Sequence, residues 1–298
     1  MMRWLILAVC ASFSLSAQAG LRAVACEPEW GALLGELGGD KVSIYTATTA
    51  QQDPHHIQAR PSLIAAVRNA DLLVCTGAEL ETGWLPLLLR QSGNAAVQPG
   101  KPGYLEAAAL VQRLEVPTRF DRADGDVHAA GNPHIHLDAR NILLVAEAVS
   151  QRLVTLDAGN AGVYQSRLAD FSRRWRSAMQ RWEREATPLR GVAIVVHHRD
   201  LAYLQNWLGL REVGTLEPKP GVEPSSAHLA GLLASLPTQR PQLIVRAAYN
   251  DGRAAEWLSA RARLPVAVLP FTVGGSPRAG DLFALFDDTI ATLLTALR

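Results

Sequence analysis

Residues 160–186 read NAGVYQSRLADFSRRWRSAMQRWEREA, and this stretch decides the fold. Its apolar positions recur at intervals of three and four residues, at Tyr164, Leu168, Phe171, Trp175, Ala178 and Trp182. That spacing predicts one helix with a single apolar stripe. At 1.5 Å per residue the helix is about 40 Å long, which is more than one small domain needs. We therefore expect a spine helix that joins two lobes.

Strand-like apolar runs alternate with helical patterns on both sides of this spine, as in αβ units. The runs are LRAVAC, KVSIYTAT and DLLVCTG before the spine, and GVAIVV, PQLIVRAAY and VAVLP after it. The two series resemble each other, because AVACEPEWGALLGELGG aligns with AIVVHHRDLAYLQNWLGL. Two similar lobes imply a cleft between them, and ligands of open α/β sheets gather at the carboxyl ends of the strands.

The predicted fold class is therefore α/β, with two similar αβ lobes and mainly parallel central sheets. One long spine helix joins the lobes, and a ligand cleft lies between them. We expect a signal peptide over residues 1–19, an N-terminal αβ lobe over 20–157, a linking long helix over 158–187 and a C-terminal αβ lobe over 188–298.

The first 19 residues have the features of a cleavable secretory signal peptide. Arg3 precedes a short apolar run, and Ala19 ends a small-residue cleavage site. Neither Cys10 nor Cys26 lies in a good lipid-attachment context. We therefore expect a soluble protein that is exported to the periplasm.

Composition and charge exclude some classes of partner. The chain has 298 residues, of which 48% are hydrophobic and 19% charged, enough for a folded core and about two domains. Removal of residues 1–19 removes Arg3 and no acidic residue. The 29 basic residues of the chain then become 28, equal to the 28 acidic ones. No basic stripe indicates binding to nucleic acid or to a membrane surface.

Cys26 and Cys75 are the cysteines of the mature chain, and each ends an apolar strand-like run. An oxidising compartment would permit a disulfide between them. Two buried thiols are the alternative, and the sequence does not decide between the two.

Seven of the eight histidines fall at three strand-to-helix junctions. They are His55 and His56 in the first, His128, His134 and His136 in the second, and His197 and His198 in the third. Imidazole is a common ligand for zinc and other borderline metals. Three imidazoles from three loops form a typical zinc site with an open fourth position. His228 lies inside an apolar helical pattern, and we interpret it as structural.

The motifs at these junctions resemble those of the metal-binding proteins of bacterial ABC importers for zinc and manganese. DPHHIQARPS resembles the family's Asp-Pro-His before a proline-led helix, and NPHIHLDARN its Pro-His-x-Trp-Leu-Asp-Pro-x-Asn. HHRDLAYLQNWLGL resembles its His-x-x-x-x-Tyr before a Tyr-Gly-Leu-like helix end. The resemblance covers essentially all of the mature chain, and the family fold of two αβ lobes joined by one long helix agrees with the prediction above.

Carried over by position, the resemblance implies three metal ligands: His55, His134 and His198. The other histidines of the same motifs, His56, His136 and His197, then occupy non-ligand positions.

The sequence departs from the family in two places. Some relatives supply an aspartate ligand after the last strand, but here that loop reads LPFTVGGSPRAGD without an acid at the matching place. The fourth ligand is then water, Glu27, which aligns opposite His198, or Asp251, which follows another strand. A long histidine-rich loop of many relatives is reduced here to FDRADGDVHAAG. In it, Asp126 and His128 either help to capture metal or belong to a plain flexible loop.

Three neutral imidazoles favour Zn²⁺ over Mn²⁺, which prefers more oxygen ligands. Cu²⁺ would also bind such a site tightly by the Irving–Williams order, so the sequence leaves the metal in vivo and its affinity open. Binding requires deprotonated imidazoles, so affinity should fall as the pH drops through about 6.5.

The resemblance implies a non-enzymatic solute-binding protein that captures Zn²⁺ and delivers it to an inner-membrane ABC permease with its ATPase. We expect a monomer, and a small periplasmic zinc carrier is a further candidate partner. One alternative is a zinc-dependent hydrolase that uses the open fourth position, with Glu27, Asp126 or Asp251 as general base. The lack of an HExxH motif argues against it. A metal-binding adhesin is a second alternative, which a lipid anchor would have favoured.

Overall fold

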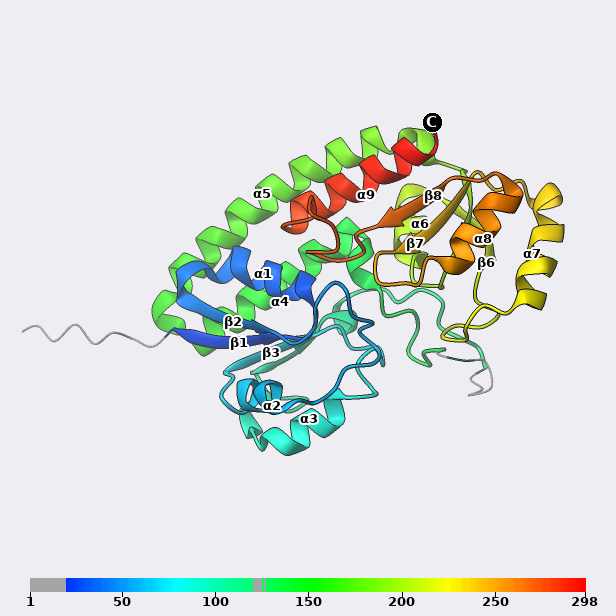
Figure 1. The fold of residues 1–298 in the computed structure, drawn as a ribbon. Helices are drawn as coiled ribbons and strands as arrows, with labels where there is room; N and C mark the ends of the chain where they lie inside the picture. The colour runs from blue at the N-terminus through cyan, green and yellow to red at the C-terminus, as the bar shows by residue number, and fades with distance from the viewer. Residues whose placement is uncertain (1–19, 120–124, 126) are drawn as a thin grey trace, which may run out of the picture.

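The computed structural model describes residues 20–298 except 120–124 and 126. The predicted signal peptide over residues 1–19 and Asp126 therefore lie outside the described residues. In the described part, the chain forms two sheets with helices packed on both faces, and one long helix runs past both sheets (Figure 1). No helix in this part is long and apolar enough to cross a membrane.

The N-terminal sheet has the strand order β2-β1-β3-β4, with parallel neighbours throughout. Its strands are β1 (Leu21–Ala25), β2 (Val42–Thr46), β3 (Leu72–Cys75) and β4 (Tyr104–Glu106). The helices of this half are α1 (Pro28–Gly38), α2 (Pro61–Arg68), α3 (Leu85–Ser92) and α4 (Ala139–Leu156). The central strands are almost wholly buried because helices cover both faces of the sheet.

The C-terminal sheet has the order β6-β5-β7-β8, again with parallel neighbours. Its strands are β5 (Ala193–Val196), β6 (Arg211–Thr215), β7 (Leu243–Ala247) and β8 (Val266–Leu269). Its helices are α6 (Ala202–Leu208), α7 (Ser226–Gln239), α8 (Arg253–Ala262) and α9 (Leu282–Ala296). The order repeats that of the first sheet strand for strand. The predicted fold class, two similar αβ lobes with parallel sheets and one spine helix, is thereby confirmed.

Short 3-10 helices lie between these elements. They are η1 (Gly39–Lys41), η2 (Ala95–Val97), η3 (Ala107–Leu110), η5 (Ile135–Leu137), η6 (Ala158–Asn160) and η7 (Thr187–Leu189). The sequence analysis did not predict β4, α3 or β6. β4 is only three residues long, and β6 is a half-exposed edge strand of polar and small residues, so neither has a strong strand pattern.

The predicted spine is α5 (Ala161–Glu185), which extends from α1 and α4 at one end to α9 at the other (Figure 1). The predicted stripe is buried, apart from Leu168, which is half-buried. One continuous apolar core contains this stripe together with buried residues of both sheets. The spine therefore fixes the two sheets relative to each other instead of linking them loosely.

Aromatic rings on α5 and α9 form the centre of this packing. Trp175 lies 5.2 Å from Phe171, 5.1 Å from Trp182 and 5.4 Å from Phe286, measured between ring centroids. Its indole N–H donates to the carbonyl of Ala139 at the start of α4, at 2.8 Å. Since the segment that precedes α4 carries His134, the spine also anchors part of the histidine cluster.

A disulfide joins Cys26, which directly follows β1, to Cys75, which ends β3. These strands are neighbours in the sheet, and the two Cα atoms lie 4.8 Å apart. Both cysteines are fully buried. Of the two states that the sequence left open, the structure has the disulfide.

Replacing Trp175 by alanine should lower the free energy of unfolding by about 3–5 kcal/mol, because it leaves a large cavity and removes the hydrogen bond to α4. Urea denaturation followed by circular dichroism measures the loss. The exposed neighbour Arg176→Ala is the matched control and should change stability by less than about 0.5 kcal/mol. Equal effects of the two changes would show that the aromatic cluster does not hold the spine.

Candidate metal centre

Three buried histidines from three segments converge where the two lobes meet. His55, His134 and His198 each offer a ring nitrogen, and these nitrogens all lie within 4.8 Å of one another. The side chains are 9%, 1% and 8% exposed. Within the described residues, the structure thus brings together the three histidines that the sequence analysis named as ligands.

Each histidine is positioned by the start or end of a regular element. His55 lies in the loop after β2, before Pro61 opens α2. His198 follows β5 by two residues. His134 immediately precedes η5 and α4, where the Asp138 side chain caps α4 by accepting from the backbone N–H of Arg140 at 2.9 Å.

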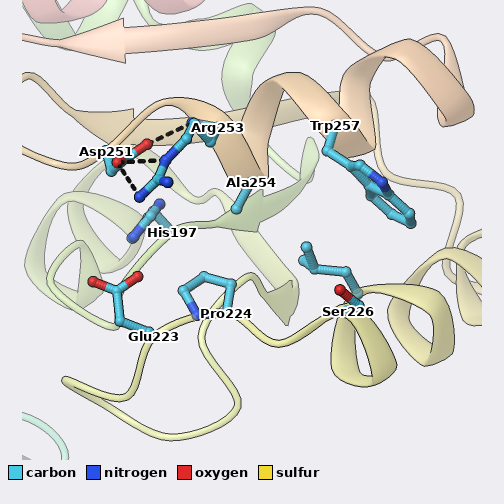
Figure 2. Close-up of a pocket in the computed structure, with 9 residues that line it drawn as sticks. His197, Glu223, Pro224, Ser226, Asp251, Arg253, Ala254 and Trp257 are labelled. Atoms are coloured by element: carbon cyan, nitrogen blue, oxygen red, sulfur yellow. Dashed lines mark hydrogen bonds and ion pairs between the residues drawn. The ribbon is translucent and has the colours of Figure 1, made fainter.

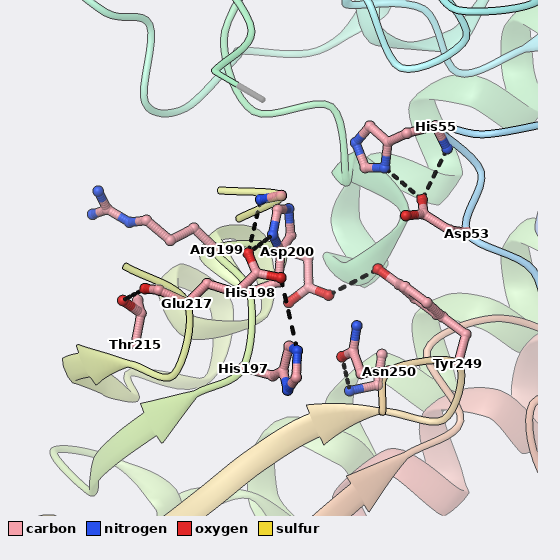
Figure 3. Close-up of polar contacts among 12 residues, drawn as sticks. Asp53, His55, His197, His198, Arg199, Asp200, Thr215, Glu217, Tyr249 and Asn250 are labelled. Carbon is pink, nitrogen blue, oxygen red and sulfur yellow. Dashed lines mark hydrogen bonds and ion pairs between the residues drawn. The ribbon is translucent and has the colours of Figure 1, made fainter. Parts of the chain in front are cut away.

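Carboxylates orient two of the three imidazoles (Figure 3). Asp53 Oδ1 lies 2.7 Å from His55 Nδ1 and also accepts from the His55 backbone N–H at 2.9 Å. Glu217 Oε2 lies 2.7 Å from His198 Nδ1 and accepts from the backbone N–H of Gly221 at 2.8 Å. Carboxylate contacts of this kind fix the orientation of metal-binding histidines and raise their basicity. They leave Nε2 of both rings for a ligand.

The charges around His198 change its protonation. Burial alone would lower the pKa of its imidazole, but the hydrogen bond to Glu217 and the charges of Asp200 and Glu217 outweigh it and raise the pKa to about 9. Burial also raises the pKa of Asp200 to about 6, against the opposing effect of His198. Tyr249 donates its hydroxyl to Asp200 Oδ2 at 3.2 Å (Figure 3). The metal-free site therefore holds a positive imidazole beside buried acids.

His134 has a different environment from the other two. Burial, followed by the neighbouring imidazoles, shifts its pKa well below the ordinary value, so the ring is neutral at physiological pH. Its Nδ1 is buried and has no hydrogen-bond partner among the described residues. The ring of Phe271 packs against it with centroids 5.4 Å apart. Packing, rather than a carboxylate, holds this ring in place.

Phe271, in the last loop, packs against the histidine cluster. It follows β8 in the loop that carries an aspartate in some relatives, and its backbone has the left-handed φ of 69°. Its ring contacts His134, and its carbonyl lies 3.1 Å from His136 Nε2. His136 Nδ1 lies 3.3 Å from Glu29 Oε1 on α1. His136 thus connects the N-terminal lobe to this loop and is not one of the three converging rings.

The structure favours neither of the two carboxylates considered as fourth ligands. Glu27 and Asp251 are both absent from the converging group in the described residues. Glu27 Oε2 accepts from the Thr76 hydroxyl at 2.9 Å, and burial and the nearby Glu81 raise its pKa well above the usual range. Asp251 instead binds the Arg253 guanidinium at 2.7 Å. The identity of the fourth ligand stays a prediction: Glu27 Oε1 is buried without a hydrogen-bond partner among the described residues, and Asp251 is engaged by Arg253.

His128 lies at the edge of the cluster. Its Nε2 is 3.2 Å from His55 Nε2, and the two rings are stacked with centroids 5.3 Å apart. Burial and the neighbouring imidazoles lower its pKa to about 4. Together with His134 and His198 it lines a cavity of about 330 Å³.

The remaining histidines lie elsewhere. His56 is exposed, and His228 Nε2 on α7 lies 2.9 Å from the carbonyl of Thr215. His197 lines a separate pocket of about 270 Å³, where Figure 2 shows it between Asp251 and Glu223. None of the three belongs to the converging group in the part of the chain that the structure describes.

Residues 24–296 match the family described as zinc-uptake complex component A, periplasmic. The chain belongs to this family. It is therefore a metal-binding, substrate-binding protein of the ABC transporter type, which works with a permease and an ATPase. Proteins of this kind bind and deliver a solute rather than transform it.

Curated relatives are similar in sequence, and solved structures share the fold. The manganese ABC transporter substrate-binding lipoprotein PsaA of Streptococcus anginosus is 23% identical over 288 residues, which cover 93% of this chain and 89% of that protein. The metal ABC transporter substrate-binding lipoprotein SsaB of Streptococcus sanguinis is 26% identical over 56% of this chain and 54% of that protein. A crystal structure of ZnuA has the same fold with a TM-score of 0.77, at 22% identity over 94% of this chain and 100% of that one. A Mn-bound periplasmic metal-binding protein from Candidatus Liberibacter asiaticus gives a TM-score of 0.76 at 17% identity, over 93% of this chain and 100% of that one.

The sequence analysis missed several residues around the cluster: Asp53, Asp200, Glu217, Tyr249 and Phe271. Asp53 was part of a quoted motif, and its spacing of two residues from His55 could have indicated a local contact. Glu217 lies 19 residues from His198 and comes close only because β5 and β6 pair.

The Glu217–His198 contact predicts how zinc binding depends on pH. With a pKa of about 9, His198 is protonated at neutral pH in the metal-free protein and must lose this proton to bind an ion. Zinc affinity should therefore rise about tenfold per pH unit between about pH 7 and 9. In Glu217→Gln the pKa of His198 should fall towards about 6.5, and most of this rise should disappear.

Competition titrations against a zinc chelator at several pH values measure this dependence. Above about pH 10, where the His198 imidazole of both proteins is neutral, Glu217→Gln should bind zinc about 10–100-fold more weakly. Parallel pH profiles for the two proteins would contradict the assigned role of Glu217.

Proposed function

We propose that this protein is a periplasmic solute-binding protein that captures Zn²⁺ through His55, His134 and His198 and passes it to an ABC permease. The supporting observation is the convergence of three buried imidazoles, from segments far apart in the chain, to within 4.8 Å. Buried polar groups without partners cost free energy, so a cluster of ring nitrogens at one point is best explained by an ion that they share.

The chemistry of the donors favours zinc over manganese. The three converging atoms are nitrogens, and two nearby carboxylates, Asp53 and Glu217, contact the Nδ1 side of the His55 and His198 rings. Mn²⁺ prefers more oxygen ligands than this site offers, whereas imidazole suits Zn²⁺. Mn²⁺ remains the second candidate because several relatives are named as manganese-binding proteins.

The ion has a short path to the centre. The cavity of about 330 Å³ opens beside His134 and His198, and residues of both lobes, including Val116 and Pro220, line it. Because α5 holds the sheets in one core, we infer that capture and release use local movements of the loops at this cavity rather than a wide hinge motion.

A hydrolase function has less support than metal capture. A hydrolase needs a general base beside the open position. Of the three carboxylates considered, Glu27 accepts from Thr76 and Asp251 binds Arg253, and Asp126 lies outside the described residues. The adhesin function, the small zinc carrier and the monomeric state stay predictions, as do the periplasmic location and the boundaries of the lobes.

Zinc titration of the mature protein tests the proposed ligands. After metal is removed with a chelator, residues 20–298 should bind one zinc ion, and changing His55, His134 and His198 together to alanine should abolish this. Each single change should weaken binding by more than the roughly 10–100-fold expected for a residue that only orients a ligand. His56→Ala is the matched control and should bind like the unaltered protein. Unchanged binding by the triple variant would refute the assignment.

The choice of metal is a separate test. In competition titrations of the unaltered protein, Zn²⁺ should displace bound Mn²⁺ at equal free concentrations, because the donors are imidazoles. Affinity alone cannot identify the physiological ion, because Cu²⁺ would also bind such a site tightly. Metal analysis of protein recovered from an intact periplasm identifies it. Recovery of the protein with manganese would overturn the choice of zinc but not the metal site.

A further inference from the structure

A second group of potential metal ligands lies inside the N-terminal lobe and shares no residue with the histidine cluster. It consists of Cys26, Cys75 and Glu81, whose sulfur atoms and carboxylate oxygen all lie within 4.8 Å of one another. All three side chains are buried. In the oxidised protein the two sulfurs are bonded to each other, so the disulfide occupies the donors that a metal would need.

The carboxylate of Glu81 is held beside the sulfur atoms by the backbone that follows Cys75. The N–H groups of Thr76 and Gly77 donate to Glu81 Oε1 and Oε2, at 2.7 Å and 3.0 Å. A carboxylate has about four lone-pair sites, so these bonds fix its position and still leave sites for a cation.

Glu27 adds a second buried carboxyl group next to this one. Its Oε2 accepts from the Thr76 hydroxyl at 2.9 Å, whereas Oε1 is buried without a hydrogen-bond partner in the described part of the chain. Burial and the charge of Glu81 raise the pKa of Glu27 well above its usual range, and burial raises the pKa of Glu81 to about 7. Buried acids are usually paired with a cation or coordinate a metal, and a metal ligand role would account for this costly pair.

The donors suit zinc once the disulfide is reduced. Zn²⁺ binds cysteine thiolates and carboxylates, and Zn–S bonds of about 2.3 Å place two sulfurs about 3.8 Å apart on a tetrahedral ion. The Cα atoms of Cys26 and Cys75 lie 4.8 Å apart at the ends of neighbouring strands. Rotation about the side-chain bonds can bring two thiolates to the required separation from there without moving the strands.

We propose that the reduced protein binds a zinc ion through Cys26, Cys75 and Glu81, and that the disulfide closes this site in the oxidised protein. A phosphine reduces the disulfide to two thiols and becomes a phosphine oxide, with the oxygen and both hydrogens taken from water. Zn²⁺ then displaces one proton from each thiol and binds both thiolates. When a small disulfide reoxidises the protein, it takes two electrons from the thiolates and leaves as two thiolates, and Zn²⁺ is released unchanged.

This inference goes beyond the proposed function because the number of bound ions depends on the redox state. The oxidised protein then holds one zinc ion, at the three histidines, and the reduced protein holds two.

Zinc stoichiometry in both redox states tests the proposal. Because both cysteines are buried, residues 20–298 are reduced in denaturant and refolded with zinc and excess phosphine, and circular dichroism checks the fold. The unaltered protein should bind two zinc ions when reduced and one when oxidised. The variant with alanine at the three histidines of the cluster, His55, His134 and His198, should bind one zinc ion when reduced and none when oxidised.

Spectroscopy of this triple variant identifies the ligands. X-ray absorption at the zinc edge should show two sulfur neighbours in the reduced state. Co²⁺ in place of zinc should give the near-ultraviolet charge-transfer absorption that thiolate ligands cause and imidazoles do not. Adding Glu81→Gln should weaken Co²⁺ binding by more than about 10-fold, which is the lower end of the loss expected for a residue that only orients a ligand. Glu79→Gln changes a nearby exposed acid and is the matched control.

Four results would overturn the proposal: no zinc in the reduced triple variant, bound zinc without sulfur neighbours, equal Co²⁺ affinities after Glu81→Gln and Glu79→Gln, or a reduced chain that does not fold even with zinc. If Glu81→Gln prevents folding, the sulfur count decides. None of these results affects the histidine site. Conversely, an oxidised unaltered protein that binds no zinc would refute the proposed function and leave the cysteine site standing.

Discussion

The packing of α5 against both halves of the molecule is the constraint on which the metal centre depends. His55 and His134 belong to the N-terminal half and His198 to the C-terminal half, so their separation is set by the positions of two sheets. Trp175 and Trp182 place aromatic rings against α9, and one apolar core runs through both halves. A chain with the same loops on a flexible linker would not hold three ring nitrogens within 4.8 Å.

The centre combines this rigid frame with opposite electrostatic environments for its ligands. His134 is neutral because it is buried against Phe271, whereas His198 is charged because Glu217 and Asp200 stabilise the proton. A dication that replaces the proton of His198 meets acids that already compensate positive charge. The same acids weaken binding when protons are abundant, so the ligand with the strongest carboxylate partner is also the one most sensitive to pH.

Much of the fold could be predicted from the sequence because its signals are local. The apolar stripe from Tyr164 to Trp182 predicted the spine, and the repeated order of strands and helices predicted two similar halves. The positions of His55, His134 and His198 at strand-to-helix junctions indicated the cluster, although their identification as ligands came from the family resemblance. Edge strand β6 was missed because its residues are half-exposed and lack an apolar pattern.

Contacts between distant segments could not be predicted in this way. Glu27 seemed suitable by alignment, but its carboxylate accepts from the Thr76 hydroxyl instead. The contact between His128 and His55 spans 73 positions and depends on how the segment before α4 packs.

The disulfide between Cys26 and Cys75 has a consequence for where the protein can accumulate. Its prediction would have required the knowledge that β1 and β3 are neighbours. The disulfide closes a loop across a sequence separation of 49 residues, and a closure of this size restricts the unfolded chain by about 4 kcal/mol in the entropic treatment. Cytosolic reductants keep thiols reduced, so a precursor retained inside the cell would lack this stabilisation. In the folded and oxidised protein, Cys26 and Cys75 are fully buried, which shields their sulfur atoms from reductants. A metal-binding protein of this kind would therefore gain its full stability only in an oxidising compartment, after the disulfide has formed.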